Sequence, residues 1–178
     1  MITLTVCAHS QNTVEEEFAM THAFNHAGLS VTDLDKAVEW YSGVFGLRLI
    51  RGPLTLDVAA PGNEPPADIF GPRWKRARIA HLATANGTGI ELFEFEDPAA
   101  ERRAENFDYW RTGIFHIAFT CPDIEDAARR IEESGGRRRS GFHEVAPGCV
   151  VCYCEDPFGN ILELVNRSYE QVNANRGD

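Results

Sequence analysis

The clearest indication of the fold is the segment Phe115-His116-Ile117-Ala118-Phe119-Thr120-Cys121-Pro122-Asp123-Ile124. It consists of an apolar, β-forming run with a histidine inside it, an aspartate seven residues after that histidine, and the start of an amphipathic segment. The same arrangement occurs once earlier, as Asn25-His26-Ala27-Gly28-Leu29-Ser30-Val31-Thr32-Asp33-Leu34. An aspartate in this position can cap a helix by accepting hydrogen bonds from the free backbone N–H groups of the first turn. The chain therefore contains two copies of a strand with a histidine followed by an aspartate-capped helix.

Further strands follow each copy, which predicts an α+β fold built from two βαβββ modules. In the first copy, a 3.6-residue apolar period from Leu34 to Phe45 predicts a helix that ends at Gly46. In the second copy, the helix begins at Ile124 and ends at Gly135-Gly136. The predicted strands are 24–31, 47–50, 79–83 and 90–95 in the first copy, and 114–120, 150–154 and 161–165 in the second.

The first copy is longer than the second. The histidine of the first strand and the glutamate of the last are 65 residues apart from His26 to Glu91, but 47 apart from His116 to Glu163. The additional residues fall within 52–72, which is rich in glycine and proline. Because long loops on a rigid scaffold are often functional, we predict that this excursion is a flap over a cleft rather than a structural strand.

The repeat also sets the expected organisation of the chain. Residues 1–22 fit neither copy and are expected to form an arm that packs on the domain or on a partner subunit, with disorder as the alternative. The polar tail is expected to fray. The predicted segments are an N-terminal arm 1–22, a first module 23–97, a linker 98–112, a second module 113–167 and a tail 168–178.

Charge and cysteine content exclude several classes of protein. A formal net charge of −10 argues against partners such as nucleic acid or an anionic membrane surface. No apolar run approaches the roughly 20 residues needed to span a bilayer, and Met1 to Cys7 lacks the features of a signal peptide. Five cysteines, three of them within 149–154, do not resemble a secreted disulfide framework. These features predict a cytoplasmic protein with reduced thiols.

Four polar residues occupy matching positions in the two copies: His26 and Glu91 in the first, His116 and Glu163 in the second. Side chains alternate across a strand, so each points away from apolar neighbours that face the helix. Two imidazoles and two carboxylates form a plausible octahedral site for one divalent ion (Ni, Co, Mn, Fe or Zn), with two positions left for substrate oxygens. Alternatively, each is an isolated polar residue on a half-exposed strand, which is less consistent with four matching positions.

Several other residues are candidates for the same site. Glu94 lies three residues after Glu91 and hence on the opposite strand face, and His81 can reach the cleft but is more simply a polar residue touching solvent. A zinc site is not expected among Cys149, Cys152 and Cys154, because the first two point to opposite strand faces. The basic residues are interpreted as a solvated edge rather than as a site for a carboxylate or phosphate; they are Arg73, Lys75, Arg76, Arg78 and Arg137–Arg139.

With its paired modules, its repeated His-x6-Asp-[Leu/Ile] motif and its closing Asp156-Pro-Phe-Gly-Asn-Ile-Leu-Glu163-Leu, the chain resembles the vicinal oxygen chelate superfamily over about residues 24–167. That superfamily includes glyoxalase I, methylmalonyl-CoA epimerase, bleomycin and fosfomycin resistance proteins, and extradiol dioxygenases. The resemblance implies that the modules form a cupped, incomplete barrel around a metal ion chelated by adjacent substrate oxygens. It also implies a homodimer, and proton transfer by Glu163 or Glu91.

Within this superfamily, ligand-capable residues at all four positions favour a metal-dependent lyase or isomerase. Such an enzyme acts on a small substrate with adjacent oxygens through an enolate-like intermediate. The residues after Glu91 lack the Thr-x-Asn-Trp-Gly run expected of glyoxalase I, so glutathione specificity is not expected. Two alternatives remain open: a non-haem iron, extradiol-type dioxygenase, and a non-catalytic resistance protein that binds a small molecule.

Overall fold

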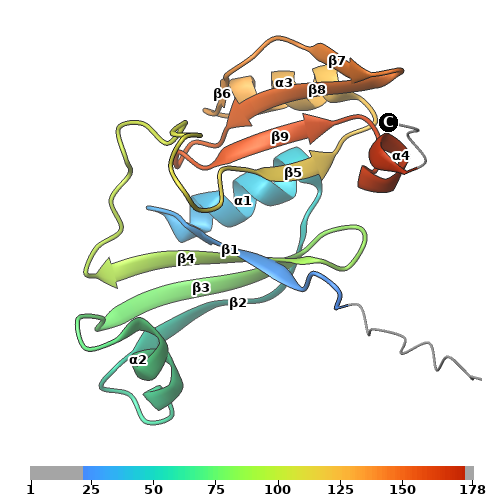
Figure 1. Cartoon of the computed structure of the whole chain (residues 1–178). Helices are drawn as coiled ribbons and strands as arrows, with labels where there is room; N and C mark the ends of the chain where they lie inside the picture. The colour runs from blue at the N-terminus through green and yellow to red at the C-terminus, as the bar shows by residue number, and fades with distance from the viewer. Residues whose placement is uncertain (1–21, 175–178) are drawn as a thin grey trace, which may run out of the picture.

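The computed structural model describes residues 22–174, which form two modules, each with its own sheet (Figure 1). The first contains β1 (His26–Ser30), α1 (Leu34–Phe45), β2 (Arg48–Asp57), α2 (Glu64–Phe70), β3 (Arg76–Ala83) and β4 (Gly89–Asp97). The second contains β5 (Ile117–Thr120), α3 (Ile124–Glu133), β6 (Arg137–Arg138), β7 (His143–Ala146), β8 (Cys149–Glu155) and β9 (Ile161–Val165), and the short helix α4 (Tyr169–Asn173) follows.

The two sheets have equivalent topologies. Their strand orders are β1-β4-β3-β2 and β5-β9-β8-β6, with β7 also pairing with β8. In each, the first strand pairs in parallel with the last strand of its module, and the remaining main pairings are antiparallel. The short strands β6 and β7 together take the place that β2 has in the first sheet. The predicted α+β fold with two βαβββ modules is therefore confirmed, with one strand of the second module divided in two.

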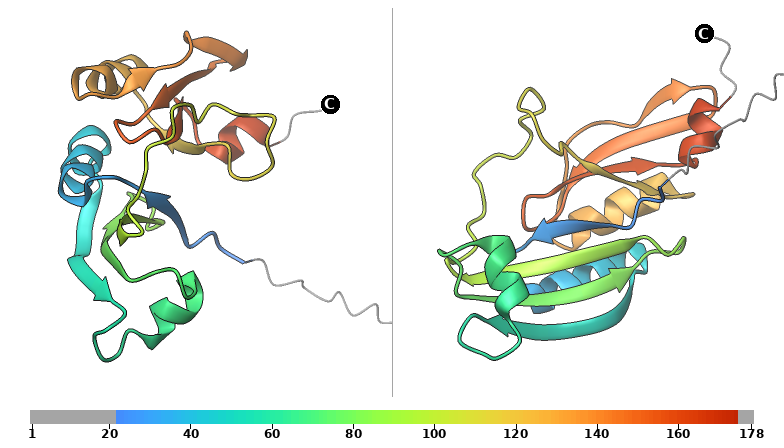
Figure 2. Two further views of the ribbon diagram at one scale, coloured as in Figure 1. Left: turned by 90° about the vertical axis from the view of Figure 1, so that its left-hand side faces the viewer. Right: turned by 60° about the horizontal axis from the view of Figure 1, so that its bottom comes forward.

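Both main helices begin at the predicted aspartates. The Asp33 side chain accepts from the backbone N–H of Lys36, and Asp123 accepts from that of Asp126. Gly46 ends α1 with φ 68°, a left-handed conformation that favours glycine. Figure 2 shows that α1 and α3 lie on the same side of the molecule, each covering one face of its own sheet. The apolar strand residues that alternate with the histidines and glutamates face these helices.

One apolar core joins the two modules. Phe45 at the end of α1 stacks on Phe119 of β5, with ring centroids 4.1 Å apart. The core continues through the buried faces of α1 and α3 and both sheets. Because residues from the two copies share this core, neither module buries its apolar surface alone.

A buried hydrogen-bond network also joins the modules. The Tyr41 hydroxyl of α1 donates to Asp156 Oδ2 at 2.7 Å, while Asp156 accepts from the backbone N–H groups of Phe158 and Asn160 and from the Asn160 amide. Asp156 is 1% exposed, and this burial raises its pKa. The Asp-Pro-Phe-Gly-Asn turn therefore fastens the second module to α1.

Removing the Tyr41 hydroxyl tests this network. Tyr41→Phe leaves the buried Asp156 carboxyl without one of its donors, and we expect the free energy of unfolding to fall by about 1.5–3 kcal/mol. Urea denaturation measures the change. The matched control is Tyr169→Phe on the exposed surface of α4, which should shift stability by less than about 0.5 kcal/mol. Equal stability of Tyr41→Phe and the parent protein would show that the hydrogen bond contributes nothing.

The structure corrects two predictions about the outer segments. Strand β2 runs to Asp57, so the first part of the excursion 52–72 is a structural strand and not a flap. The tail was expected to fray, but it contains the short helix α4, capped by Ser168. The predicted arm 1–22 lies almost entirely outside the described residues. Between residues 22 and 174, no helix has the length and apolarity needed to cross a membrane.

We predict a homodimer from the edges of these sheets. Strands β1, β2 and β5 are sheet edges, and large apolar side chains near them are exposed, including Ile114 at 87% and Phe24 at 72%. Light scattering at micromolar concentration should give about twice the mass of one chain. A monomer mass would reject this prediction.

Candidate functional site

The first predicted pair lies on the open face of the first sheet. His26 Nε2 and Glu91 Oε2 are 3.4 Å apart, although the residues come from β1 and β4. Their neighbours Ala27 and Ile90 are buried on the helix side, as alternation requires. Asn25 Oδ1 lies 2.6 Å from His26 Nδ1. If the Nδ1 carries the proton, this contact orients the ring so that Nε2 presents a lone pair toward the cleft, as second-shell partners do for metal-binding histidines.

The second pair has the same arrangement. His116 immediately precedes β5, and its Nε2 lies 3.0 Å from Glu163 Oε2 of β9. The His116 ring packs edge-on against Phe115 and Tyr153, with centroids 5.2 Å away in both cases. Its Nδ1 is buried and has no hydrogen-bond partner among the described residues. Each module thus brings one imidazole and one carboxylate together.

A third residue joins each pair from the next strand. His81 of β3 is directly opposite Glu91, with Nδ1 3.1 Å from Oε1, so the carboxylate has an imidazole at each oxygen. Tyr153 of β8 is directly opposite Glu163 in the same way. Burial, together with the negative charge of Glu163, raises the pKa of the Tyr153 phenol. His81 therefore belongs to the cleft and is not merely a solvent-facing polar residue.

Sequence analysis missed Tyr153, although a signal for it exists. His81 and Tyr153 each stand ten residues before the glutamate of their module. The two copies carry different side chains at this position, so matching metal-binding residues between the copies do not reveal it.

The two pairs lie in different sheets. Among residues 22–174, no three histidine, cysteine, aspartate or glutamate side chains converge on one metal position. The structure therefore forms two half-sites, His26–Glu91 and His116–Glu163. A hollow of about 330 Å³ is bordered by β1 and by the chain around Phe115, so the segments carrying the two histidines flank a common opening.

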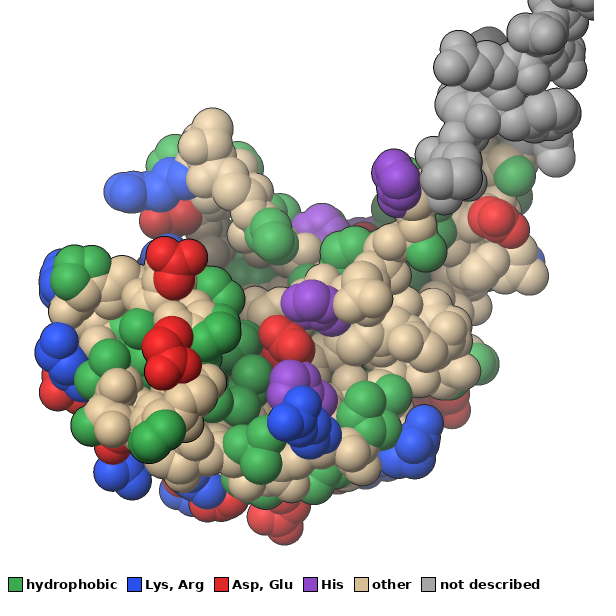
Figure 3. Space-filling view, turned by 90° about the horizontal axis from the view of Figure 1, so that it is seen from below, with side chains coloured by type: hydrophobic (Ala, Val, Ile, Leu, Met, Phe, Trp, Pro, Cys, Tyr) green, Lys and Arg blue, Asp and Glu red, His purple; other side chains and the backbone are tan. Residues whose placement is uncertain are grey.

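The open face of the first sheet has a polar end and an aromatic end. Figure 3 looks onto a hollowed surface where histidine, acidic and basic side chains lie beside one another. At the other end, Phe93 and Phe95 follow Glu91 at two-residue steps and stack on each other, with centroids 5.7 Å apart. Phe70 of α2 packs edge-on against both rings. The helical part of the excursion therefore covers this face, whereas its first residues extend β2.

Shortening the covering segment tests its role. Replacing residues 59–72 by a tight turn removes Phe70 and α2 but keeps β2, β3 and the buried Trp74. We expect a folded variant with a cooperative urea transition and an affinity for substrate weakened about tenfold, because the aromatic wall of the cleft is lost. An unfolded product would instead assign α2 to the core.

The remaining candidates have structural contacts. Glu94 is on the helix side, where it accepts from the backbone N–H of Leu34 at the start of α1 and from Arg78. The cysteines within 149–154 are buried and free. Most of the basic residues considered in the sequence are held in ion pairs: Arg76 with Glu96 and Asp57, Arg78 with Asp35 and Glu94, Arg138 with Glu132, and Arg137 and Arg139 with Glu155.

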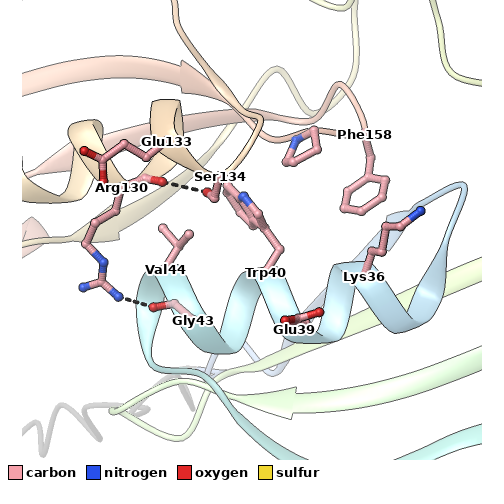
Figure 4. Close-up of a pocket in the computed structure, with 10 residues that line it drawn as sticks. Lys36, Glu39, Trp40, Gly43, Val44, Arg130, Glu133, Ser134 and Phe158 are labelled. Carbon is pink, nitrogen blue, oxygen red and sulfur yellow. Dashed lines mark hydrogen bonds between the residues drawn. The ribbon is translucent and has the colours of Figure 1, made fainter.

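A separate crevice of about 540 Å³ lies between α1 and α3 (Figure 4). Trp40, Val44 and Phe158 form its apolar walls, and Arg130 of α3 donates to the backbone carbonyl of Gly43 across it. The crevice is on the helix side and includes neither half-site.

Comparison with known sequences places the fold in a family. Residues 23–164 match the profile of the Glyoxalase/Bleomycin resistance protein/Dioxygenase superfamily. The chain belongs to this superfamily. The match covers both modules of the glyoxalase-like fold and both half-sites, which confirms the family resemblance inferred from the repeated motif.

Named relatives of this superfamily member are enzymes. The chain is 32% identical over 149 residues to a 2-epi-5-epi-valiolone epimerase from Actinomyces sp. The aligned region covers 81% of this chain and 79% of the relative. The chain is 26% identical to a lactoylglutathione lyase from Escherichia coli O157:H7, over 85% of this chain and 95% of the relative. A lactoylglutathione lyase from Schizosaccharomyces pombe is also 26% identical, but this chain spans only 51% of its length.

Solved structures agree with the fold. A glyoxalase family protein from Bacillus cereus superposes with a TM-score of 0.69 at 20% identity, covering 84% of this chain and 96% of that one. Glyoxalase I from Zea mays gives a TM-score of 0.56 at 24% identity, covering 82% and 44%. These likenesses support the glyoxalase-like architecture of two modules.

Proposed function

We propose that the protein is a metal-dependent lyase or isomerase of the glyoxalase-like type. The substrate is a small molecule with adjacent oxygens, and the reaction passes through an enolate-like intermediate. The observation that carries this proposal is the repetition of a histidine–glutamate pair on the open face of each sheet, at 3.4 Å in the first module and 3.0 Å in the second.

By donor type, His26, Glu91, His116 and Glu163 could together hold one divalent ion, shared between the two half-sites. Imidazole nitrogen and carboxylate oxygen suit Ni, Co, Mn, Fe or Zn. Because Asn25 contacts Nδ1 of His26, the other ring nitrogen, Nε2, is directed toward the cleft. The four side chains are between 17% and 45% exposed, so an ion can reach them from solvent. When bound, such an ion polarises a substrate carbonyl and makes the neighbouring C–H more acidic.

The carboxylates of this site supply the proton transfer. Glu163 or Glu91 takes the proton from the carbon next to the carbonyl and returns it, on the same or the opposite face of the carbon. His81 contacts the second oxygen of Glu91, and Tyr153 lies opposite Glu163, so each carboxylate is held from the neighbouring strand. Holding the base in place lowers the entropic cost of reaching the transition state.

The named relatives support this reaction class. An epimerase is 32% identical and spans most of the chain, and lyases form the other named matches. Return of the proton to the opposite face is the step that an epimerase requires, so we favour the isomerase branch for this chain.

Isotope exchange tests the proposed function. The metal-loaded protein is incubated in deuterated water with 2-epi-5-epi-valiolone, thiohemiacetals and 2-methyl-branched acyl thioesters. Deuterium should appear at the carbon next to the carbonyl in at least one of them, without consumption of oxygen. Oxygen uptake with a catechol and no exchange in any carbonyl compound would instead assign an extradiol-type dioxygenase.

A further inference from the structure

Strand β2 contains an irregularity that places two arginines on one face. Arg48 pairs with Ala83 and Leu49 with Leu82, but Arg51 pairs with His81, which leaves Ile50 as an extra residue on β2. Residues three apart in a regular strand point to opposite faces. The extra residue, Ile50, shifts the alternation of side chains between the two faces by one position. Arg48 and Arg51 therefore point to the same side of the sheet.

That side is the face of the first half-site. Arg51 is opposite His81, and His81 is opposite Glu91, so three adjacent strands place an arginine, a histidine and a glutamate in one row. The next row runs from Arg48 through Ala83 and Gly89 to His26. With neighbouring strands about 4.8 Å apart, the Arg51 backbone is about 10 Å from that of Glu91, and the Arg48 backbone is about 14 Å from that of His26. Both arginine side chains are long enough to extend toward the half-site.

The backbone after the bulge depends on a glycine. Gly52 has φ 97°, and a Cβ on it would lie 2.6 Å from the carbonyl oxygen of Ile79. A larger residue would therefore force β2 away from β3 immediately next to Arg51. Bulges that re-aim a side chain are common beside active sites, and this one directs a second positive charge toward the cleft.

Both arginines are available to bind an anion. Arg48 and Arg51 are exposed, and within residues 22–174 neither makes an ion pair or a side-chain hydrogen bond. Arg76 and Arg78 of the adjacent strand, in contrast, are both held by carboxylates. Guanidinium groups bind carboxylate and phosphate oxygens through paired, charge-assisted hydrogen bonds, so two of them on one face form a receptor for an oxyanion.

From this geometry we infer that Arg48 and Arg51 bind an oxyanion, a carboxylate or a phosphate, at one end of the substrate while its adjacent oxygens face His26 and Glu91. The substrate class of the proposed function, on which this inference rests, is therefore narrowed to small hydroxycarbonyl compounds with an anionic end. The chain has a net charge of −10, so two unpaired arginines beside the cleft form a local positive region. This region favours a substrate with an anionic end over an otherwise similar uncharged molecule.

Three probes that share an α-hydroxy ketone separate the contribution of the charge: dihydroxyacetone, dihydroxyacetone phosphate and 5-hydroxylevulinate. Calorimetric titration at constant ionic strength gives their affinities for the parent protein, for the double variant Arg48→Met/Arg51→Met and for the control Arg129→Met. Arg129 lies on the outer surface of α3, away from both sheets' open faces, so the control removes a positive charge at a distance. Each titration is performed with metal-free and with metal-loaded protein.

We expect at least one anionic probe to bind the parent about tenfold or more tightly than dihydroxyacetone, and this ratio to fall toward one only in the double variant. The stronger of the two anionic probes identifies the oxyanion as phosphate or carboxylate. Equal affinities in the parent, or a ratio that survives in the double variant, would overturn the inference. A ratio that depends on the arginines while metal-dependent exchange is absent would support the anion site and reject the proposed reaction instead.

Discussion

Replacing Glu163 by glutamine is expected to abolish exchange of the substrate proton next to the carbonyl, with a rate loss of about 10²–10⁴-fold. The amide has nearly the same shape and can still bind through its oxygen, but it cannot take up the proton. Glu163 lies between His116 and Tyr153 on the open face of the second sheet, so the loss follows from chemistry and not from altered packing.

Deuterium incorporation followed by NMR measures this rate. The matched control is Glu94→Gln, because Glu94 is also a strand glutamate but lies on the helix side beside Leu34 and Arg78. It should retain exchange at close to the parental rate after correction for the folded fraction. Exchange at the parental rate in Glu163→Gln would exclude this carboxylate as the base and leave Glu91 as the candidate.

Loss of metal binding is the second large expected effect. The parent should bind about one divalent ion per chain, and His26→Ala, Glu91→Ala, His116→Ala and Glu163→Ala should each weaken binding by more than about 100-fold, since second-shell changes alone typically cost 10–100-fold. Competition with a chromogenic chelator gives the affinities. The reason is that each substitution removes one of the four side chains proposed to hold the ion.

The control for the histidines is His143→Ala, on the exposed strand β7 and outside both half-sites. It should leave metal affinity unchanged, and urea denaturation should show that all the variants remain folded. Full affinity in both His116→Ala and Glu163→Ala would remove the second module from the site and contradict the four-residue assignment.

Local signals predicted the parts of the fold that depend on local chemistry. Asp33 and Asp123 cap α1 and α3 because a carboxylate satisfies free N–H groups wherever a helix begins, and Gly46 ends α1 because few other residues accept its φ. Strand alternation correctly placed Glu91 on the open face and Glu94 on the helix side. The repeat strengthened the predictions of the two aspartate caps and of the two strand glutamates, because each occurs in both copies.

Features that depend on contacts between distant residues were not predictable in this way. The length of β2 is set by its pairing with β3 as far as Asp57 and Arg76, and glycine and proline within it suggested a loop. The bulge that turns Arg51 toward the cleft is visible only in the register of that pairing. The hydrogen bond from Tyr41 to Asp156 joins residues 115 positions apart in the sequence, one from each module. No local pattern in either module indicates it.

The relation between the two half-sites is also a property of packing. The sequence indicates that each module contributes a histidine and a glutamate, but it does not indicate how the sheets are placed. In the structure the half-sites lie on separate sheets, and the hollow of about 330 Å³ lies between the segments that carry the two histidines. The central claim is that these two pairs bind one ion together.

Anomalous diffraction from crystals grown with Mn(II) or Co(II) tests this claim most directly. We expect one strong anomalous peak per chain, with two imidazole nitrogens and two carboxylate oxygens at about 2.0–2.2 Å, supplied by His26, Glu91, His116 and Glu163. A peak bound by only one of the pairs, a peak elsewhere on the protein, or no peak in crystals soaked at millimolar metal would contradict it.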